Sequence, residues 1–372
     1  MGAASYPRAL WRLAIADKDL TIDLAPRLMQ LTLTDNPGLE ADQLDLTLSD
    51  ADGLLDIPAR GVRLSLALGR SDMGLLDKGS YTVDEVEHSG TPDQLTIRAH
   101  SADLRESLLT KKERSWHGTT LGAIVRKIAQ EHKLKPAISP ELEKAEVKHL
   151  DQQSESDASF LTRLALTYDA MATVKDSVLI FYAIGRGKTI NGEPLPEVTV
   201  TRASGDRHRF SVSDREGCAG VSANYYDKQA GKQGTVTIRE QDLKKGQQKD
   251  NVGGNAQAEG GKLKVLRHTY ASRKNAARAA VSALKKALRG ASTFSLSLAL
   301  GRPDIVTELA ATVSGWKPAI DGTRWRVAKV THQLSGSGMT TDLELELRTA
   351  EPGEAGNDDD ENEDGHDDSE GD

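Results

Sequence analysis

The chain has 372 residues, of which 28% are charged and 4% aromatic, with a formal net charge of −8 at pH 7. This length allows two or three domains, no stretch approaches the roughly 20 apolar residues that span a bilayer, and the charged first 20 residues exclude a signal peptide. Cys218 is the single cysteine, which excludes an internal disulfide and favours assembly in a reducing cytoplasm.

The acidic charge is concentrated at the C-terminus. Residues 351–372 hold 12 of the 56 Asp and Glu residues and no Lys or Arg, which leaves 44 acidic and 48 basic residues in the body. Because this tail has no periodic apolar residues, we expect it to be disordered. It is either a solubilising appendage, or a tail that competes for a basic partner surface or shields the basic body until assembly.

Residues 1–108 are expected to form a first β domain. Large apolar residues alternate with polar ones, and turn residues stand between the runs. Five or six antiparallel strands about ten residues apart are typical of a small barrel or sandwich. The predicted strands are residues 27–35, 44–48, 64–68, 81–87 and 95–99.

Residues 109–190 change character and predict a small α/β domain. Thr119 or Thr120 caps a helix whose apolar residues recur with helical spacing from Leu121 to Ala129. A second amphipathic helix begins within residues 154–157, and residues 178–182 form a short buried strand.

Residues 191–350 predict a second β domain with additions. Ser272 caps a strongly basic helix over residues 272–288, and Gly290 follows its end. Residues 246–261 have almost no apolar content and predict a mobile loop. The remaining expected elements are strands at 198–200, 220–226, 235–240, 294–300, 325–334 and 341–348, and a short helix at 305–313.

Two sequence matches link the first and second β domains. Residues 64–72 (LSLALGRSD) return as residues 296–304 (LSLALGRPD), in each case as an alternating strand followed by a glycine turn at Gly69 or Gly301. A second match follows in the same order. It pairs Tyr81, Val83, Val86 and His88 with Trp325, Val327, Val330 and His332.

The offsets of the two matches are 232 and 244 positions, so the later copy carries 12 additional residues, which we assign largely to the 305–313 helix. We interpret the pattern as an internal duplication of one β domain. The alternative is that alternating Leu and Ala runs occur in any two β domains.

The motifs do not predict an active site. Residues 185–189 (GRGKT) end like a phosphate-binding loop, but Tyr182 stands where that pattern needs glycine and no helix follows. Cys218 lies in a glycine-rich turn with His208 as the one nearby base, which favours a passive role. The nine His residues lack metal-ligand spacing. We expect no catalytic, cofactor-binding or metal-binding residues, and no cofactor.

Three interpretations with weaker signals stay open. Two carboxylates can meet from anywhere in a fold, so a glycosidase-type pair is possible in principle, although the chain has few of the aromatics that sugar clefts use. The basic helix at 272–288 either contacts nucleic-acid phosphates or has a solvated face. His88 and His332 recur with their strands, which favours a structural role for both.

The ordered motifs resemble the late-control D family, the baseplate hub proteins of P2-like contractile phage tails. They are also similar to the hubs of larger myophages and to the N-terminal part of type VI secretion spike proteins. The resemblance covers residues 5–349 and leaves out the acidic tail. The motifs that carry it are residues 19–21, 27–35, 41–50, 64–72, 120–125 and 156–161.

The resemblance implies an α+β, mainly β fold with two tube-like antiparallel β barrels and a small α/β domain between them. It implies a structural homotrimer in the virion, assembled in the bacterial host cytoplasm, that adapts a hexameric tail tube to a trimeric central spike. Baseplate wedge proteins, the tape measure protein and DNA in transit are the further partners that it implies. A spike-associated peptidoglycan hydrolase is the alternative function.

Overall fold

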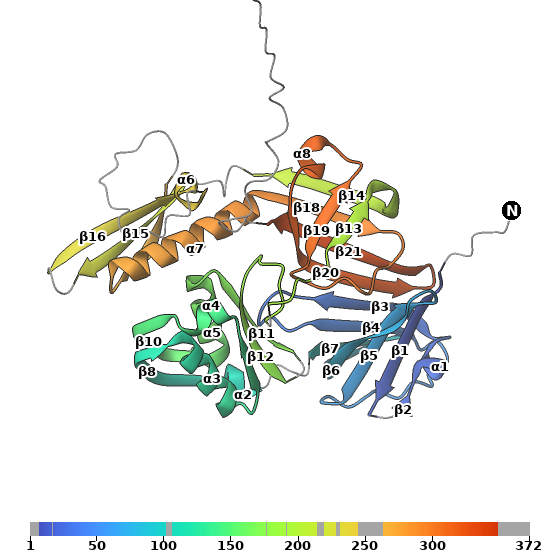
Figure 1. The fold of residues 1–372 in the computed structure, drawn as a ribbon. Coiled ribbons are helices and arrows are strands. Elements are labelled where there is room, and N and C mark those ends of the chain that lie inside the picture. The colour runs from blue at the N-terminus through green and yellow to red at the C-terminus, as the bar shows by residue number, and fades with distance from the viewer. Residues whose placement is uncertain are drawn as a thin grey trace, which may run out of the picture.

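The computed structural model describes residues 7–16, 18–101, 106–175, 177–190, 192–213, 219–227, 231–244 and 263–348. The fold is α+β and mainly β, with antiparallel pairing dominant (Figure 1). Within these residues no helix combines the length and apolar character that crossing a membrane requires. The predicted loop 246–261, Cys218 and the acidic tail lie outside the described residues.

The first strand run begins the chain and contains its own apolar core. Alternate side chains of its strands are buried, as in Leu31 and Leu33 of β3 and Leu44, Leu46 and Leu48 of β4. The run consists of β1 (Ala9–Ile15), β2 (Lys18–Asp19), α1 (Thr21–Leu24), β3 (Leu28–Asp35), β4 (Gln43–Ser49), β5 (Arg63–Arg70), β6 (Gly74–Ser89) and β7 (Gln94–Ser101).

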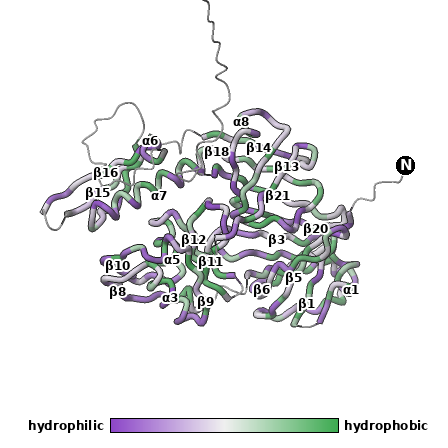
Figure 2. The backbone as a smooth tube through the Cα atoms, viewed as in Figure 1, coloured by the Kyte–Doolittle hydropathy of each residue, from purple (hydrophilic) through white to green (hydrophobic). Residues whose placement is uncertain are grey.

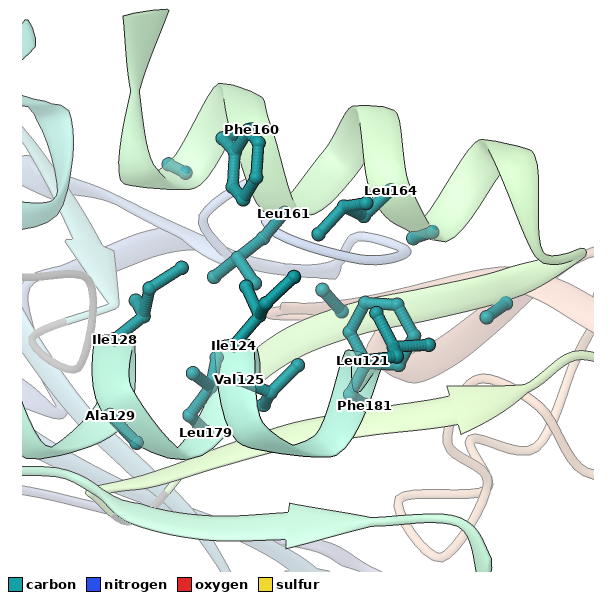
Figure 3. Packing of buried hydrophobic residues seen from close by; sticks show 14 of the residues in the cluster. Leu121, Ile124, Val125, Ile128, Ala129, Phe160, Leu161, Leu164, Leu179 and Phe181 are labelled. Carbon is teal, nitrogen blue, oxygen red and sulfur yellow. The ribbon is translucent and has the colours of Figure 1, made fainter. Parts of the chain in front are cut away.

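The middle unit follows and is built around two capped helices. The hydroxyls of Thr120 and Ser156 accept backbone N–H bonds from Ala123 and Ser159, which begins α3 and α5 as predicted. Their apolar faces meet above the sheet formed by β11, β12 and β9 (Figure 3). The unit contains α2 (Glu106–Leu109), β8 (Lys111–Thr120), α3 (Leu121–Glu131), β9 (Lys135–Ile138), α4 (Pro140–Glu143), β10 (Glu146–Ser156), α5 (Asp157–Thr167), β11 (Ala170–Lys175) and β12 (Val178–Ala183).

The second strand run occupies most of the C-terminal part. Its core gathers around Trp325 and Phe294, which are fully buried. It contains β13 (Val198–Thr201), a 3-10 turn (Arg202–Ser204), β14 (Gly205–Val212), β18 (Ser292–Leu298), β19 (Ala310–Ser314), α8 (Pro318–Asp321), β20 (Trp325–Ser335) and β21 (Gly338–Leu347).

A separate unit, which we call the arm, interrupts this run between β14 and β18. Its three-stranded sheet packs one face on α7 and extends away from the rest of the molecule (Figure 1). The outer ends of β15 and β16 are hydrophilic (Figure 2). The arm contains β15 (Gly220–Asp227), β16 (Lys232–Arg239), α6 (Glu240–Lys244), β17 (Leu263–Tyr270) and α7 (Arg273–Ala291).

Three local predictions were wrong. Residues 305–313 do not form a helix, because Ala311 and Val313 alternate with exposed neighbours in strand β19. Gly290 lies inside α7, which continues to Ala291. Gly69 lies within β5 opposite Leu75, where the close approach of the Gly74 carbonyl leaves no room for a side chain.

Five strands of the first run correspond in order and pairing to five strands of the second. β3, β4, β5, β6 and β7 correspond, in this order, to β14, β18, β19, β20 and β21. The pairs of the first run are β5–β6, β6–β7, β7–β4 and β4–β3. The corresponding pairs of the second run are β19–β20, β20–β21, β21–β18 and β18–β14. The outer partners differ, because β1 is antiparallel to β5 whereas β13 is parallel to β19.

Both register shifts of the second run also have counterparts in the first. The register shifts after Val83 in the β6–β7 pair and after Val327 in the β20–β21 pair. It shifts again at the start of β3 against β4, after Leu28, and at the start of β14 against β18, after Gly205. Bulges fix local twist and strand direction, so these coincidences place the five strand pairs in the same register.

This correspondence of strands agrees with the second sequence match and disagrees with the first. The second match, which includes Val83 with Val327, joins strands that hold the same place, β6 and β20. The first match joins β5 to β18, whereas the pairing order matches β18 to β4 and β5 to β19. As a strand correspondence the first match was wrong, because period-two alternation records burial and not the identity of neighbouring strands. Closure of either run into a barrel stays a prediction.

Candidate functional site: the junction between the two strand runs

Strand β20 joins the two runs into one sheet of 13 strands. It pairs with β21 along one side and with β3 along the other, with Val330 opposite Asp35, His332 opposite Leu33 and Leu334 opposite Leu31. The two cores are therefore connected through backbone hydrogen bonds (Figure 1). Because the two runs share one hydrogen-bonded sheet, their relative position is fixed within one chain.

His332 is buried at the centre of this junction. Its side chain is 1% exposed, and Nδ1 lies 2.9 Å from the hydroxyl oxygen of Thr341 on β21. Burial, together with the nearby Lys78 ammonium, lowers the pKa of His332 to about 3. The imidazole is neutral at physiological pH and has the structural role that the sequence favoured.

An ion cluster ties the middle unit to the junction. The Lys175 ammonium lies 2.8 Å from Asp35 Oδ1 and 3.3 Å from Asp42 Oδ2, and the Thr307 N–H donates to Asp35. Burial and the Asp35 charge raise the pKa of Asp42 to about 6. Burial also raises the pKa of Asp35, but Lys175 and the Thr307 N–H outweigh it and leave that pKa below its usual value.

A second cluster lies beside it on the second run. The Arg326 guanidinium is 4% exposed and donates to Glu308 and, at 2.8 Å, to Glu346. Burial raises the pKa of Glu308 against the opposing effect of Arg326. These charges lie where the two strand runs and the middle unit meet, and they add ion pairs to the backbone pairing of the junction.

Glu131 and Asp157 are two close carboxylates in the middle unit, the arrangement that would favour the hydrolase alternative. Their oxygens and a His132 nitrogen lie within 4.8 Å of one another. Lys112 and Arg114 bridge both acids, with Lys112 Nζ 2.7 Å from Asp157 and 3.0 Å from Glu131.

These cations set the chemistry of the cluster. Burial raises the pKa of Asp157 and of Glu131, but hydrogen bonds from His132 and Lys112 to Asp157, and from Lys112 and Arg114 to Glu131, outweigh it and lower both pKa values. A general acid needs a raised pKa, and a metal ion would meet two positive side chains already in place. The geometry is that of a structural ion network.

The remaining sequence candidates are dispersed. Residues 184 and 185 form a turn directly after β12, which is the predicted strand-to-turn connection, and the Gly185 carbonyl accepts a hydrogen bond of 3.1 Å from the Arg348 side chain. His88 lies 3.2 Å from buried Asp50, and His208 packs against Phe294 and Trp316.

The scattered-histidine prediction missed one pair. His117 and His149 are directly opposite on β8 and β10, with their Nδ1 atoms 3.0 Å apart. Both positions are exposed, and Asp151 accepts from His149 at 3.1 Å. Their separation of 32 residues gave no local signal.

The basic helix α7 is not simply a solvated face. Arg289 is 5% exposed and its guanidinium lies 2.7 Å from Asp169 of the middle unit, while Lys285 lies 3.4 Å from the same carboxylate. The Arg278 guanidinium lies 4.4 Å from the centre of the Tyr168 ring. Much of the basic charge of α7 therefore fixes the arm to the middle unit.

Comparisons with known proteins agree with this architecture. A family model described as "Phage tail baseplate hub (GPD)" matches residues 41–338. The "Probable baseplate hub protein" of Escherichia phage P2 is 41% identical over 362 residues, covering 92% of this chain and 94% of that protein.

Two solved structures share the fold at low identity. The 43 kDa tail protein of prophage MuSo2 from Shewanella oneidensis has a TM-score of 0.64 at 12% identity, covering 92% of this chain and 98% of that one. The E. coli c3393 protein, described as a component of the type VI secretion system, has a TM-score of 0.55 at 13% identity, covering 91% and 77%.

The family model and the similar phage P2 protein, together with the continuous sheet, therefore define a phage-type tail protein. This agrees with the family resemblance of the sequence motifs. The chain belongs to the phage tail baseplate hub (GPD) family, whose place is the baseplate of the virion tail.

Proposed function

We propose that this hub protein acts as a homotrimer that adapts a hexameric tail tube to a trimeric central spike. The observation that carries the proposal is the correspondence of five strands in each run, down to the positions of their bulges. Three chains would supply six similar units around one axis, while the chain as a whole repeats three times.

Such a ring presents different symmetry on its two sides. The six similar units match a hexameric tube, and the features present once per chain, such as the middle unit and the arm, match a trimeric spike or the baseplate wedges. Heterologous contacts that close on rotation generate rings of this kind. The tape measure protein and DNA would pass through the centre.

The proposal does not rely on the basic side chains of α7 as a channel lining. Lys285 and Arg289 both face Asp169 of the middle unit. Charge reversal at Arg289 would therefore disturb the docking of the arm, so its effect on infectivity would not report on passage through a channel.

The test is the solution mass of the chain, alone and co-expressed with the spike protein of the same phage. Because one chain has a mass of 40.1 kDa, the proposal is supported by a species of about 120 kDa for the chain alone, or of about 120 kDa plus the mass of the bound spike protein after co-expression. A monomer in both samples would contradict it. Light scattering coupled to size exclusion distinguishes the two outcomes without calibration by shape.

A further inference from the structure

The edges of β14 and of the last part of β6 lack a backbone partner among the residues that the structure describes. β14 pairs with β18 on one side only. β6 pairs with β7 along residues 81–89, but its other side is occupied only as far as Val83, first by β5 and then by residues 61 and 62. The free backbone of β6 therefore runs from Asp84 to Ser89.

These edges correspond to the two strands that form the internal junction. β6 corresponds to β20 with an offset of 244 residues, and β3 corresponds to β14 with an offset of 177. Equivalent backbone hydrogen bonds of 2.7 to 2.9 Å support the offset of 244 residues. Val83 forms them with residues 61 and 62, and Val327 forms the same two bonds with residues 308 and 309. The junction β20–β3 thus has an unfilled counterpart, β6 with β14, that one chain does not complete.

We infer that β14 of one subunit pairs antiparallel with the free segment of β6 in a second copy of this chain. Applying the two offsets to the observed β20–β3 register gives the contacts directly. This pairing deepens the proposed function and rests on it, since it specifies how one subunit joins the next. The expected opposite pairs are Val86 with Val212, Glu87 with Ser211, His88 with Phe210 and Ser89 with Arg209.

The side chains at these positions suit the pairing. Val212 is 62% exposed, which is unusual for a large apolar residue at a sheet edge, and pairing would cover it with Val86. On the opposite face Arg209 would lie diagonal to Glu87, within reach of a long side chain. Both are exposed in the single chain.

The corresponding positions of the internal junction are uncharged. Thr331 and Gln333 of β20 lie opposite Thr34 and Thr32 of β3. The proposed contact between subunits thus has an ion pair where the internal one has hydroxyl and amide groups. Opposite charges at β6 and β14 favour their mutual pairing over competition with β20 or β3.

Cysteine cross-linking tests the register. In a Cys218→Ser background, Ser89→Cys is placed in one tagged chain and Arg209→Cys in a chain with a different tag, and the two are assembled with the spike protein. We expect an intermolecular disulfide on oxidation. Thr32→Cys with Gln333→Cys in one chain is the positive control, since these residues are already opposite. Ser89→Cys with Arg207→Cys is the control out of register.

Charge exchange provides a second measurement on the same contact. Glu87→Arg and Arg209→Glu should each weaken trimer formation by roughly fivefold, the range of a cross-strand ion pair, and the double variant should recover it. A trimer that forms without the Ser89–Arg209 cross-link overturns this register and leaves the proposed function standing. A chain that stays monomeric with its spike protein overturns the proposed function and this pairing with it.

Discussion

The Nη1 of Arg70 donates a hydrogen bond of 3.3 Å to the carbonyl oxygen of Gly301. The two residues belong to the two Gly-Arg-x-Asp segments, and in each segment the arginine also pairs with its own aspartate, Asp72 or Asp304. The segments that look alike in sequence are therefore neighbours in space, although their strands do not hold equivalent places in the sheet.

Gly69→Ala should destabilise the protein by about 2 kcal/mol or more. A Cβ at this position would lie 1.9 Å from the Gly74 carbonyl oxygen, so the β5–β6 hairpin would have to move apart. Gly336→Ala is the matched control, because its Cβ would meet nothing within 4 Å. Urea unfolding compares the two, and equal midpoints would contradict the close approach.

Asp42 should make the protein less stable as pH rises from 4 to 6. Its pKa is about 6 in the folded chain and 3.8 in its ordinary state, so between these values the folded state holds a proton that the unfolded state has lost. Relative to Asp42→Asn, the wild type should lose about 2 kcal/mol over this range. Asp45→Asn, on the same strand, should keep the wild-type slope in pH-dependent urea unfolding.

His332 should act in the opposite direction. The pKa of His332 is about 3 in the folded chain and 6.5 in its ordinary state. Below pH 6.5 the unfolded state therefore binds a proton at this imidazole that the folded state does not bind. Stability is therefore lost as pH falls, by about 1.4 kcal/mol for each unit below 6.5. His332→Gln should reduce this dependence, and His268→Gln, at an exposed position of β17, should retain it. Identical slopes in all three proteins would exclude a buried neutral His332.

Asp157→Asn should lower the free energy of unfolding by about 3 kcal/mol or more. The carboxylate is fully buried and accepts from His132, Lys112 and Gln152, so the amide would remove one of the two carboxylates that neutralise Lys112 and Arg114 and leave only Glu131. Asp151→Asn, at a half-buried position of β10, is the control and should change stability much less. Thermal unfolding with a structural probe in the middle unit measures both, and a small effect at Asp157 would mean that the network contributes little.

Local signals in the sequence were sufficient for the longer helices, α3 and α5 of the middle unit and α7 of the arm. The hydroxyls of Thr120, Ser156 and Ser272 cap α3, α5 and α7 through bonds to residues three positions later, so each start is encoded within one turn. The apolar stripes behind these caps then bury on one face. Period-two alternation likewise predicted β3 and β4.

The place of each strand in the sheet could not be predicted in the same way. β18 and β5 share an apolar pattern because both bury one face, yet they have different neighbours, which pairing alone determines. The sequence did not show that the arm is a unit distinct from the second strand run. Its sheet depends on the parallel pairing of β17 with β15, which no local pattern records. The junction was missed because Asp35 and Lys175 are 140 residues apart.

The arm leaves and rejoins the sheet at nearly one point. β14 and β18 are adjacent strands, and the Ser213 N–H donates to the Ala291 carbonyl at 2.9 Å, so the two ends of the excursion are joined like the base of a hairpin. A chain segment inserted in this way changes length without shifting any strand of the main sheet. Hub proteins of this family can therefore vary this appendage while the main sheet keeps its dimensions.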